Sequence, residues 1–310
     1  MSATQFICPN GDRVQIEECL KKCKQGQRCM FLPILKAIAN TSNRKMNKPS
    51  VTELIVGVRE IYLKKMTDYA VDPFSVLNAI QGQAVHKLSE NNAEGIMSEI
   101  RLEDGITSGK FDLYGDLLDE GDGVLGDIKV TNSYKIMKAL GIYKVDVPTG
   151  EVYKTGEKKG QPKYRKDIRT DGVKEKFDWT LQLNYYRRML EREGYEVKKM
   201  VIQAINKDSS GRIGAETGIT EKSYLIEINR ISDHWLKKYF SIKAKMLKEA
   251  IENKELPPIC NARERWQDRK CLDYCSAREN CPYAKRLKLE KEAKRDESTT
   301  AEKGKQDLKS

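Results

Sequence analysis

Residues 109–129, GKFDLYGDLLDEGDGVLGDIK, decide which fold and which chemistry this chain can support. Two runs that alternate apolar and polar residues flank the turn residues 120–123, and this pattern predicts a β-hairpin. Because side chains alternate across a strand, Asp127 and Lys129 share one face of the second strand. The hairpin should therefore bring Asp112 of the first strand beside Asp127 and Lys129.

Two carboxylates and one ammonium on a single surface suit the cleavage of phosphodiester bonds. Carboxylate oxygens are hard ligands for Mg²⁺ or Mn²⁺, and such a cation polarises a phosphate and lowers the pKa of bound water. The Lys129 ammonium can orient that water or stabilise charge on the phosphate oxygens. Asp116 shares the face of Asp112 and is the reserve ligand if the strand register is shifted. The competing interpretation is a solvent-exposed hairpin face that carries ordinary ion pairs.

The elements around this hairpin predict an α/β (α+β) fold, a mixed sheet flanked by helices. Hydrophobic periodicity and capping signals predict the helices, and apolar runs bounded by turns predict the strands. The expected helices cover 32–39, 178–194 and 234–252, with two more beginning at Ser50 and Pro73; the expected strands cover 96–105, 198–207 and 223–231.

Four short motifs resemble those of the RecB-like branch of the PD-(D/E)XK nuclease superfamily. Residues 109–112 and 126–129 look like its G-x-x-D and D-x-K core. Residues 82–86, GQAVH, resemble its G-x-x-x-H helix, and residues 182–186, QLNYY, resemble its Q-x-x-x-Y helix. The motifs follow the family's order and extend over residues 80–190.

This resemblance implies a restriction-endonuclease-like core that hydrolyses DNA. The implied catalytic residues are Asp112, Asp127, Lys129, Gln182 and Tyr186, and the implied ligands of Mg²⁺ or Mn²⁺ are His86, Asp112, Asp127 and the carbonyl of Ile128. Glu99 stands where such nucleases often carry an acidic residue. The competing interpretations are that His86 satisfies a hydrogen bond in a core, that Gln182 is a polar position on an apolar helix face, and that Tyr186 only packs.

All eight cysteines fall into two quartets with the same spacing, C-x10-C-x3-C-x5-C. Four thiolates are the ligand count of a tetrahedral metal site, which predicts Zn²⁺ or a [4Fe–4S] cluster rather than free structural thiols. The quartets are Cys8, Cys19, Cys23 and Cys29, and Cys260, Cys271, Cys275 and Cys281.

The resemblance does not decide which metal the quartets bind. CRISPR-associated and AddB-type members of the superfamily hold a [4Fe–4S] cluster with one N-terminal cysteine and three near the C-terminus. Here there are eight cysteines rather than four, and the local step is C-x3-C rather than C-x2-C. Self-contained quartets suit zinc equally well, and the two could form separate sites or exchange ligands.

The expected domain organisation follows from the cysteines and the motifs. A four-cysteine module is expected at 1–30, the nuclease core at 31–254, a second four-cysteine module at 255–284 and a disordered tail at 285–310. The core contains a long polar insertion at 136–178.

Charge points to a polyanionic partner. Lys and Arg number 57 against 46 Asp and Glu, a net charge of +11, and nucleic acid is the commonest partner of such a surplus. Within the insertion, residues 150–176 are basic and carry Tyr153 and Tyr164. This composition suits a flap that binds a nucleic-acid strand, but it equally suits a solvated, mobile loop.

Together these patterns predict an Mg²⁺- or Mn²⁺-dependent deoxyribonuclease, an exonuclease or end-processing enzyme of recombination, repair or phage and mobile-element DNA metabolism. Its partners would be single-stranded DNA or duplex ends, with recombination or replication proteins. A cytoplasmic location is expected, because neither a signal peptide nor a membrane span is apparent. The alternatives are a catalytically silent nuclease fold that binds nucleic acid and a zinc-ribbon scaffold.

Overall fold

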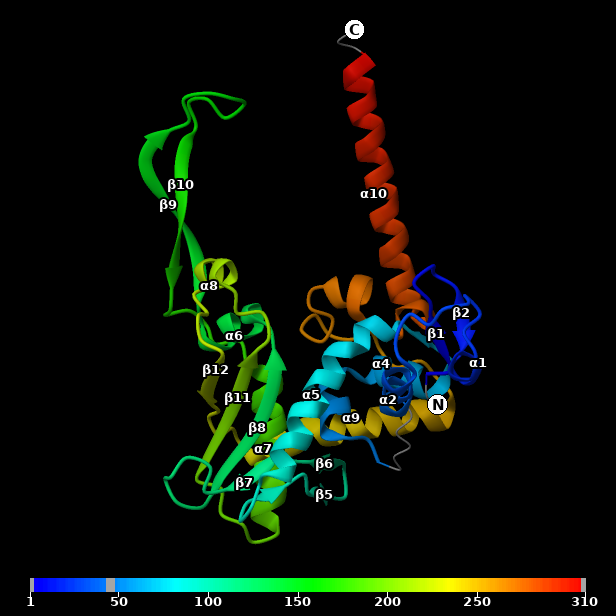
Figure 1. Cartoon of the computed structure of the whole chain (residues 1–310), viewed down its shortest axis with the longest axis vertical. Helices are drawn as coiled ribbons and strands as arrows, with labels where there is room; N and C mark the ends of the chain where they lie inside the picture. Colours follow the sequence, from blue (N-terminus) through cyan, green and yellow to red (C-terminus); the bar gives the residue numbers. More distant parts are fainter. Residues whose placement is uncertain (1–2, 43–47, 308–310) are drawn as a thin grey trace. The chain divides into compact units, whose positions relative to one another are not determined.

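The structure of the chain is a computed structural model that describes residues 3–42 and 48–307 (Figure 1). It divides into two compact units. The terminal unit contains residues 1–80, 103–108 and 237–310, and the sheet unit contains residues 81–102 and 109–236. This division differs from the expected domains, because both cysteine quartets share one unit with the helices of residues 31–80.

A five-stranded mixed sheet forms the centre of the sheet unit, with the order β12-β11-β8-β7-β4 (Figure 1). Strands β8 and β11 run parallel, whereas the other neighbouring pairs are antiparallel. The strands are β4 (Met97–Ser98), β7 (Leu113–Gly115), β8 (Val124–Thr131), β11 (Lys199–Asn206) and β12 (Ser223–Glu227). The hairpin predicted from residues 109–129 is confirmed as the antiparallel pair β7 and β8.

Helices pack on this sheet, so the mixed α/β fold predicted from the sequence is confirmed at that level. Helix α7 (Phe177–Arg192) packs against β8 and β11 through a largely apolar buried face that includes Leu181 and Leu183. Helix α6 (Ser133–Leu140) begins at an Asn132 cap, and α8 (Gly211–Thr217) packs against it. The helix expected at 178–194 therefore exists with nearly the predicted bounds.

The expected strand over residues 96–105 is wrong in its continuity. The chain forms β4 and then β5 (Arg101–Glu103), separated by Glu99 in the left-handed region at φ 54°. Strand β5 pairs with β6 (Ser108–Lys110), and the chain resumes at β7 only after Asp112. Tertiary hydrogen bonds hold this break, because the Glu99 amide donates to the Asp112 carbonyl at 2.9 Å.

The polar insertion predicted at 136–178 contains ordered structure. After α6, strands β9 (Tyr143–Val152) and β10 (Pro162–Arg169) form an antiparallel ribbon that is separate from the five-stranded sheet. Figure 1 shows the ribbon extending from the end of the sheet unit at which α6 and α8 lie.

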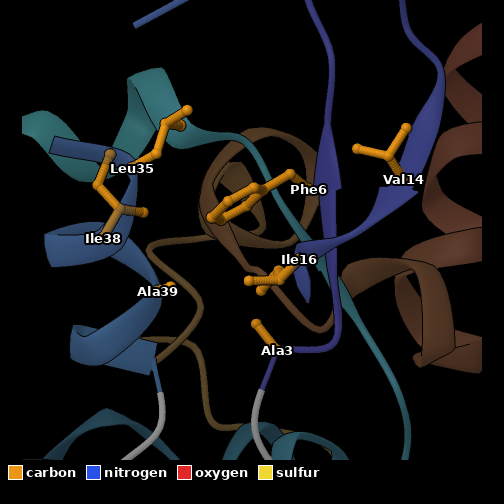
Figure 2. Packing of buried hydrophobic residues seen from close by; sticks show 7 residues of the cluster. All are labelled: Ala3, Phe6, Val14, Ile16, Leu35, Ile38 and Ala39. Atoms are coloured by element: carbon orange, nitrogen blue, oxygen red, sulfur yellow. The ribbon is translucent and has the colours of Figure 1, made fainter. Parts of the chain in front are cut away.

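The terminal unit contains a small sheet, β2-β1-β3, made of β1 (Gln5–Ile7), β2 (Arg13–Gln15) and β3 (Ala70–Val71). Figure 2 shows its apolar side chains meeting helix α2 (Leu32–Ser42). The cluster consists of Ala3, Phe6, Val14, Ile16, Leu35, Ile38 and Ala39, with Cys8 and Cys19 packed against it.

Helix starts in the terminal unit follow the capping signals of the sequence. Ser50 caps α3 (Val51–Val56) in a complete capping box with Glu53, as predicted. This unit also contains α1 (Ile16–Lys21) and α4 (Val58–Met66), and α5 (Pro73–Asn91) begins in it. Helix α9 (Asp233–Asn253), which was also expected, begins in the sheet unit and continues into the terminal unit.

The tail expected to be disordered from residue 285 is instead helical as far as Asp307, within α10 (Pro282–Asp307). Lys, Glu, Ala and Arg are good helix formers, and pairs such as Arg286 with Glu290 support them along the helix. Low apolar content therefore did not exclude a helix. Within the described residues, no helix combines the length and the apolar character needed to cross a bilayer.

Candidate metal centre

The β7–β8 hairpin places Asp112 beside the middle of β8. Leu113 pairs with Gly126, so Asp112 stands opposite Asp127 at the next position. The buried Asp112 side chain accepts a hydrogen bond from the Ile128 amide at 2.8 Å through Oδ2. This bond fixes one carboxylate oxygen against the strand that carries Asp127 and Lys129.

His86 and Glu99 complete a group of possible metal ligands around Asp112. Nδ1 of His86, on α5, lies 3.3 Å from Asp112 Oδ2 and 3.4 Å from Glu99 Oε1. One ligand atom from each of the three residues lies within 4.8 Å of the others. Among the side chains that the structure describes, this is the one group of three His, Cys, Asp or Glu residues with such spacing.

Glu99 was only a weak candidate in the sequence, yet the structure makes it part of this group. The left-handed backbone at Glu99 ends β4 and turns the chain there, and the Lys110 ammonium pairs with the carboxylate. The Glu99 side chain is 11% exposed. An acidic residue inside an apparent strand was the available signal, but the break in that strand was not visible in the hydrophobic pattern.

Asp127 is adjacent to this group, and its own oxygens are engaged elsewhere. Its buried carboxylate accepts a hydrogen bond from Gln182 Nε2 at 2.9 Å through Oδ1. Oδ2 lies 2.6 Å from the Lys129 ammonium, close enough for an ion pair but without the angles of a directed hydrogen bond. A cation that bound Asp127 would therefore compete with Lys129 for this oxygen.

Gln182 and Tyr186 stand behind Asp127 on α7. Gln182 Nε2 lies 3.4 Å from the Tyr186 hydroxyl, so the amide is shared between the carboxylate and the phenol. Burial, together with the charge of Asp127, raises the pKa of Tyr186 and keeps the phenol protonated. Gln182 contacts Asp127 and Tyr186 contacts Gln182, so the contacts of both residues lead to the Asp127 carboxylate.

Asp116, the reserve ligand, does not join the site. Its exposed carboxylate accepts hydrogen bonds from the amides of Glu120 and Gly121 at 3.1 and 3.2 Å. These bonds belong to the turn that connects β7 to β8. The strand register is therefore the unshifted one, with Asp112 as the carboxylate that faces β8.

The charges in this site alter one another's protonation. Burial, and then the neighbouring charge of Asp127, raises the pKa of Asp112 to about 7. Burial disfavours the Lys129 ammonium, but Asp127 and Asp112 outweigh it, so the pKa of Lys129 is raised. Burial lowers the pKa of His86, and Asp127 opposes that shift. Near neutral pH the imidazole is therefore neutral and Asp112 is poised to release its proton.

Binding of Mn²⁺ should therefore depend on pH. The raised pKa of Asp112 gives the metal-free protein stability that is present at low pH and lost as the pH rises through about 7. Mn²⁺ needs the carboxylate, so it should raise the unfolding temperature more at roughly pH 8 than at roughly pH 6. Thermal unfolding with and without Mn²⁺ measures this difference. Equal shifts at both pH values, or the same pH dependence in Asp112→Asn, would contradict it.

Glu99→Gln tests the ligand that the tertiary structure adds. Glutamine replaces a charged oxygen near the cation with a neutral one. Mn²⁺ binding should weaken roughly 10-fold or more, because changes in metal ligands, or in the groups that hydrogen-bond to them, lower metal affinity on this scale. Calorimetric titration of the variant measures the affinity. Glu94→Gln, an exposed position between α5 and β4, is the matched control and should bind as the unaltered protein does.

The first cysteine quartet lies in the terminal unit around β1 and α1. Burial raises the pKa of Cys8, and Cys29 and Cys23 raise it further; burial also raises the pKa of Cys19, with a further contribution from Cys8, Cys23 and Cys29. The Arg28 guanidinium donates to the carbonyls of Cys19, Leu20 and Lys21, which fixes the loop that carries the last two thiols.

The second quartet lies around residues 260–281 of the same unit. Burial, and then the charges of Cys260 and Cys281, raises the pKa of Cys271 to about 11. Burial, and then Glu60, raises the pKa of Cys275 to about 12. Gly57 leaves room for this quartet, because a Cβ there would lie 3.0 Å from the Cys260 sulfur.

Neighbouring thiols raise the pKa of Cys8 and Cys19 in the first quartet and of Cys271 in the second, and no disulfide joins the cysteines. In the described chain neither quartet gathers three ligand atoms within 4.8 Å of one another. A group of four thiols nevertheless fits a thiolate-binding metal by its chemistry. Binding such a metal would release protons from all four sulfurs.

Comparisons with known proteins assign neither a family nor a function to this chain. No protein-family model matches the chain, and no curated protein matches it. Among solved structures, the one described as "Crystal structure of SSO0001" is similar, with 14% sequence identity over 80% of this chain and 93% of that chain. The TM-score of 0.40 is too low to assign a fold family or a function.

Proposed function

We propose that this chain is a divalent-metal-dependent nuclease that hydrolyses DNA, with a PD-(D/E)XK-type core in the sheet unit. The observation that carries the proposal is the meeting of His86, Glu99 and Asp112 next to Asp127 and Lys129. These residues come from α5, the β4–β5 break and the β7–β8 hairpin. The competing interpretation is a surface with ordinary ion pairs. Such a surface does not explain why a neutral imidazole, His86, lies beside a buried carboxyl, Asp112, whose pKa is about 7.

The donor set fits Mg²⁺ or Mn²⁺. Carboxylate oxygens dominate it, and a single imidazole favours Mn²⁺ over Mg²⁺. The carboxyl of Asp112, with a pKa of about 7, can ionise at neutral pH. The Ile128 backbone hydrogen-bonds to the His86 imidazole and donates to Asp112, so this strand segment faces the ligands. When bound, the cation supplies the Lewis acidity that polarises a scissile phosphate.

The chain's own groups then have distinct tasks. His86, Glu99 and Asp112, with Asp127, would hold the cation. Lys129 keeps its proton and presents a positive charge beside Asp127, where it stabilises negative charge that develops on phosphate oxygens. Gln182 holds Asp127 in one orientation, and Tyr186 holds Gln182.

DNA cleavage tests the proposal directly. The protein is incubated with end-labelled linear DNA, single-stranded and duplex, and with circular DNA, in Mn²⁺ and in EDTA. Cleavage in Mn²⁺ that EDTA abolishes supports the proposal, and the circular substrate distinguishes internal cuts from attack at ends. Absence of EDTA-sensitive cleavage on every substrate would reject it.

A catalytically silent protein that binds nucleic acid is the second candidate. One observation favours it: Lys129 and Lys110 already pair with Asp127 and Glu99, so the acidic groups have partners without a cation. Calorimetric titration with Mn²⁺ separates the two candidates. A silent protein of this kind would bind DNA but would show no Mn²⁺ binding that depends on Asp112.

A further inference from the structure

The β9–β10 ribbon is exposed over most of its length and has no layer packed on it. An isolated two-stranded ribbon is only marginally stable in water. A ribbon of this length adds little to the stability of the fold, which points to a role in binding a partner. Its exposed side chains include Tyr164, 56% exposed, and Val152, 50% exposed. At about 3.3 Å per residue, the ten residues of β9 extend about 30 Å.

The base of the ribbon is attached firmly to the sheet unit. The amides of Gly172 and Glu175 donate to the carbonyls of Gly141 and Lys138 at 2.9 and 2.8 Å. Gly218, which caps the C-terminus of α8, packs tightly on β10, because a Cβ at this position would lie 3.1 Å from the Ile168 side chain. The ribbon therefore projects from a fixed root in the unit that carries the candidate metal centre.

Positive charge on the ribbon is largely uncompensated. Residues 143–169 contain eight Lys and Arg against four Asp and Glu. Two of the cations have acidic partners within 4 Å, Lys163 with Glu151 and Arg165 with Asp167. Within the described residues the other six pair with no carboxylate: Lys144, Lys154, Lys158, Lys159, Lys166 and Arg169.

The tip concentrates this charge in a defined turn. Tyr153 and Gln161 close it, with the Tyr153 amide donating to the Gln161 carbonyl at 3.0 Å and the Gly160 amide donating to the Tyr153 carbonyl at 2.8 Å. Gly156 and Gly160 adopt φ values of 78° and 83°, which allow the tight reversal. Between them and beside them the tip presents Lys154, Lys158 and Lys159.

An aromatic ring stands among these cations. The ammonium groups of Lys158 and Lys163 lie 6.0 and 5.9 Å from the centroid of the Tyr153 ring. Phosphate-binding cations with an adjacent ring match a sugar-phosphate backbone and the bases attached to it. A two-stranded ribbon also has the width that the major groove of a duplex admits.

We propose that the β9–β10 ribbon is an anchoring arm that binds the phosphate backbone of the DNA substrate, with Lys154, Lys158 and Lys159 as its principal contacts. The proposal rests on the proposed function for the identity of the substrate. Binding requires neither metal nor cleavage, because the arm is made of residues outside the metal centre. The arm would hold DNA on the sheet unit while the β7–β8 hairpin acts on it.

The test measures binding in a chain that cannot cleave. The tip variant changes three residues to Gln in the full-length Asp127→Asn protein: Lys154, Lys158 and Lys159. Fluorescence anisotropy with labelled single-stranded and duplex DNA, in EDTA, gives the dissociation constant across a range of NaCl concentrations. The matched control changes Lys237, Lys238 and Lys245, three exposed lysines of α9, to Gln in the same background.

The tip variant should bind roughly 10-fold more weakly, and the slope of log affinity against log salt should fall by about 2 to 3, because each lost phosphate contact removes about 0.9. The control should keep both values. Unchanged affinity and slope in the tip variant, or an equal loss in the control, would overturn the anchoring arm.

A small substrate separates this proposal from the proposed function. The tip variant with Asp127 intact should hydrolyse bis(p-nitrophenyl) phosphate in Mn²⁺ at the unaltered rate, because this diester is too short to reach the arm. A variant that loses this activity as well would contradict a role limited to anchoring. If no phosphodiester is cleaved by any form of the protein, the nuclease proposal fails while the binding result still decides the arm.

Discussion

Asp127→Asn should reduce DNA cleavage roughly 100-fold or more, the scale on which the loss of one preorganised charged group in an active site acts. Asp127 is fully buried, with Gln182 on one oxygen and Lys129 on the other. Asparagine keeps the size of the side chain and can still accept the hydrogen bond from Gln182. The change therefore removes a negative charge with little change in packing.

Lys129→Gln should lose cleavage to a similar extent but retain Mn²⁺. Its ammonium is not a ligand, and its removal frees an oxygen of Asp127 for the cation. Asp112→Asn, in contrast, should lose both cleavage and Mn²⁺ binding, because Asp112 belongs to the group that includes His86 and Glu99. Cleavage rates and calorimetric Mn²⁺ titrations, measured on the same preparations, distinguish the two outcomes.

Folding has to be measured beside activity, because removing one partner of a buried ion pair costs about 3–5 kcal/mol. Thermal unfolding followed by circular dichroism shows whether each variant is native. Asp119→Asn, on the exposed turn between β7 and β8, is the control and should cleave normally. An Asp127→Asn protein that is folded and fully active would reject the metal centre as the site of chemistry.

We predict that each cysteine quartet binds a metal, and on that prediction removing its thiols should have the second large effect, on stability rather than on chemistry. Structural thiolate sites contribute about 10 kcal/mol or more to folding at neutral pH. Cys8 and Cys19 pack against the apolar cluster around Phe6 in the terminal unit. Cys19→Ser with Cys23→Ser, or Cys271→Ser with Cys275→Ser, should therefore lower the unfolding temperature sharply.

Each quartet serves as the control for the other. Thiol charges act within a quartet, from Cys29 and Cys23 on Cys8 and from Cys260 and Cys281 on Cys271. We therefore expect two separate sites, so that either double variant loses half of the bound metal. Elemental analysis measures the metal, and the visible absorption of anaerobically purified protein distinguishes [4Fe–4S] from Zn²⁺. Complete loss of metal from one double variant would show that the quartets share a single centre.

The sequence alone determined the features that depend on neighbouring residues. Alternation through residues 124–129 and the glycine-rich turn before them specify the β7–β8 hairpin, and with it the approach of Asp112 to Asp127. Ser50 with Glu53 specifies the start of α3. The identical spacing of the two cysteine groups predicts the two quartets. In each case the energies involved act over a few residues, so the local pattern is sufficient.

Which distant residues meet depends on the packing of the whole chain. Glu99 joins His86 and Asp112 because a left-handed residue breaks a strand that the hydrophobic pattern presents as continuous. The ribbon of residues 143–169 and the α10 helix also escaped the pattern, because neither buries a periodic apolar face. The position of such elements is set by packing and hydrogen bonds between segments far apart in the chain, which no local arrangement of residues encodes.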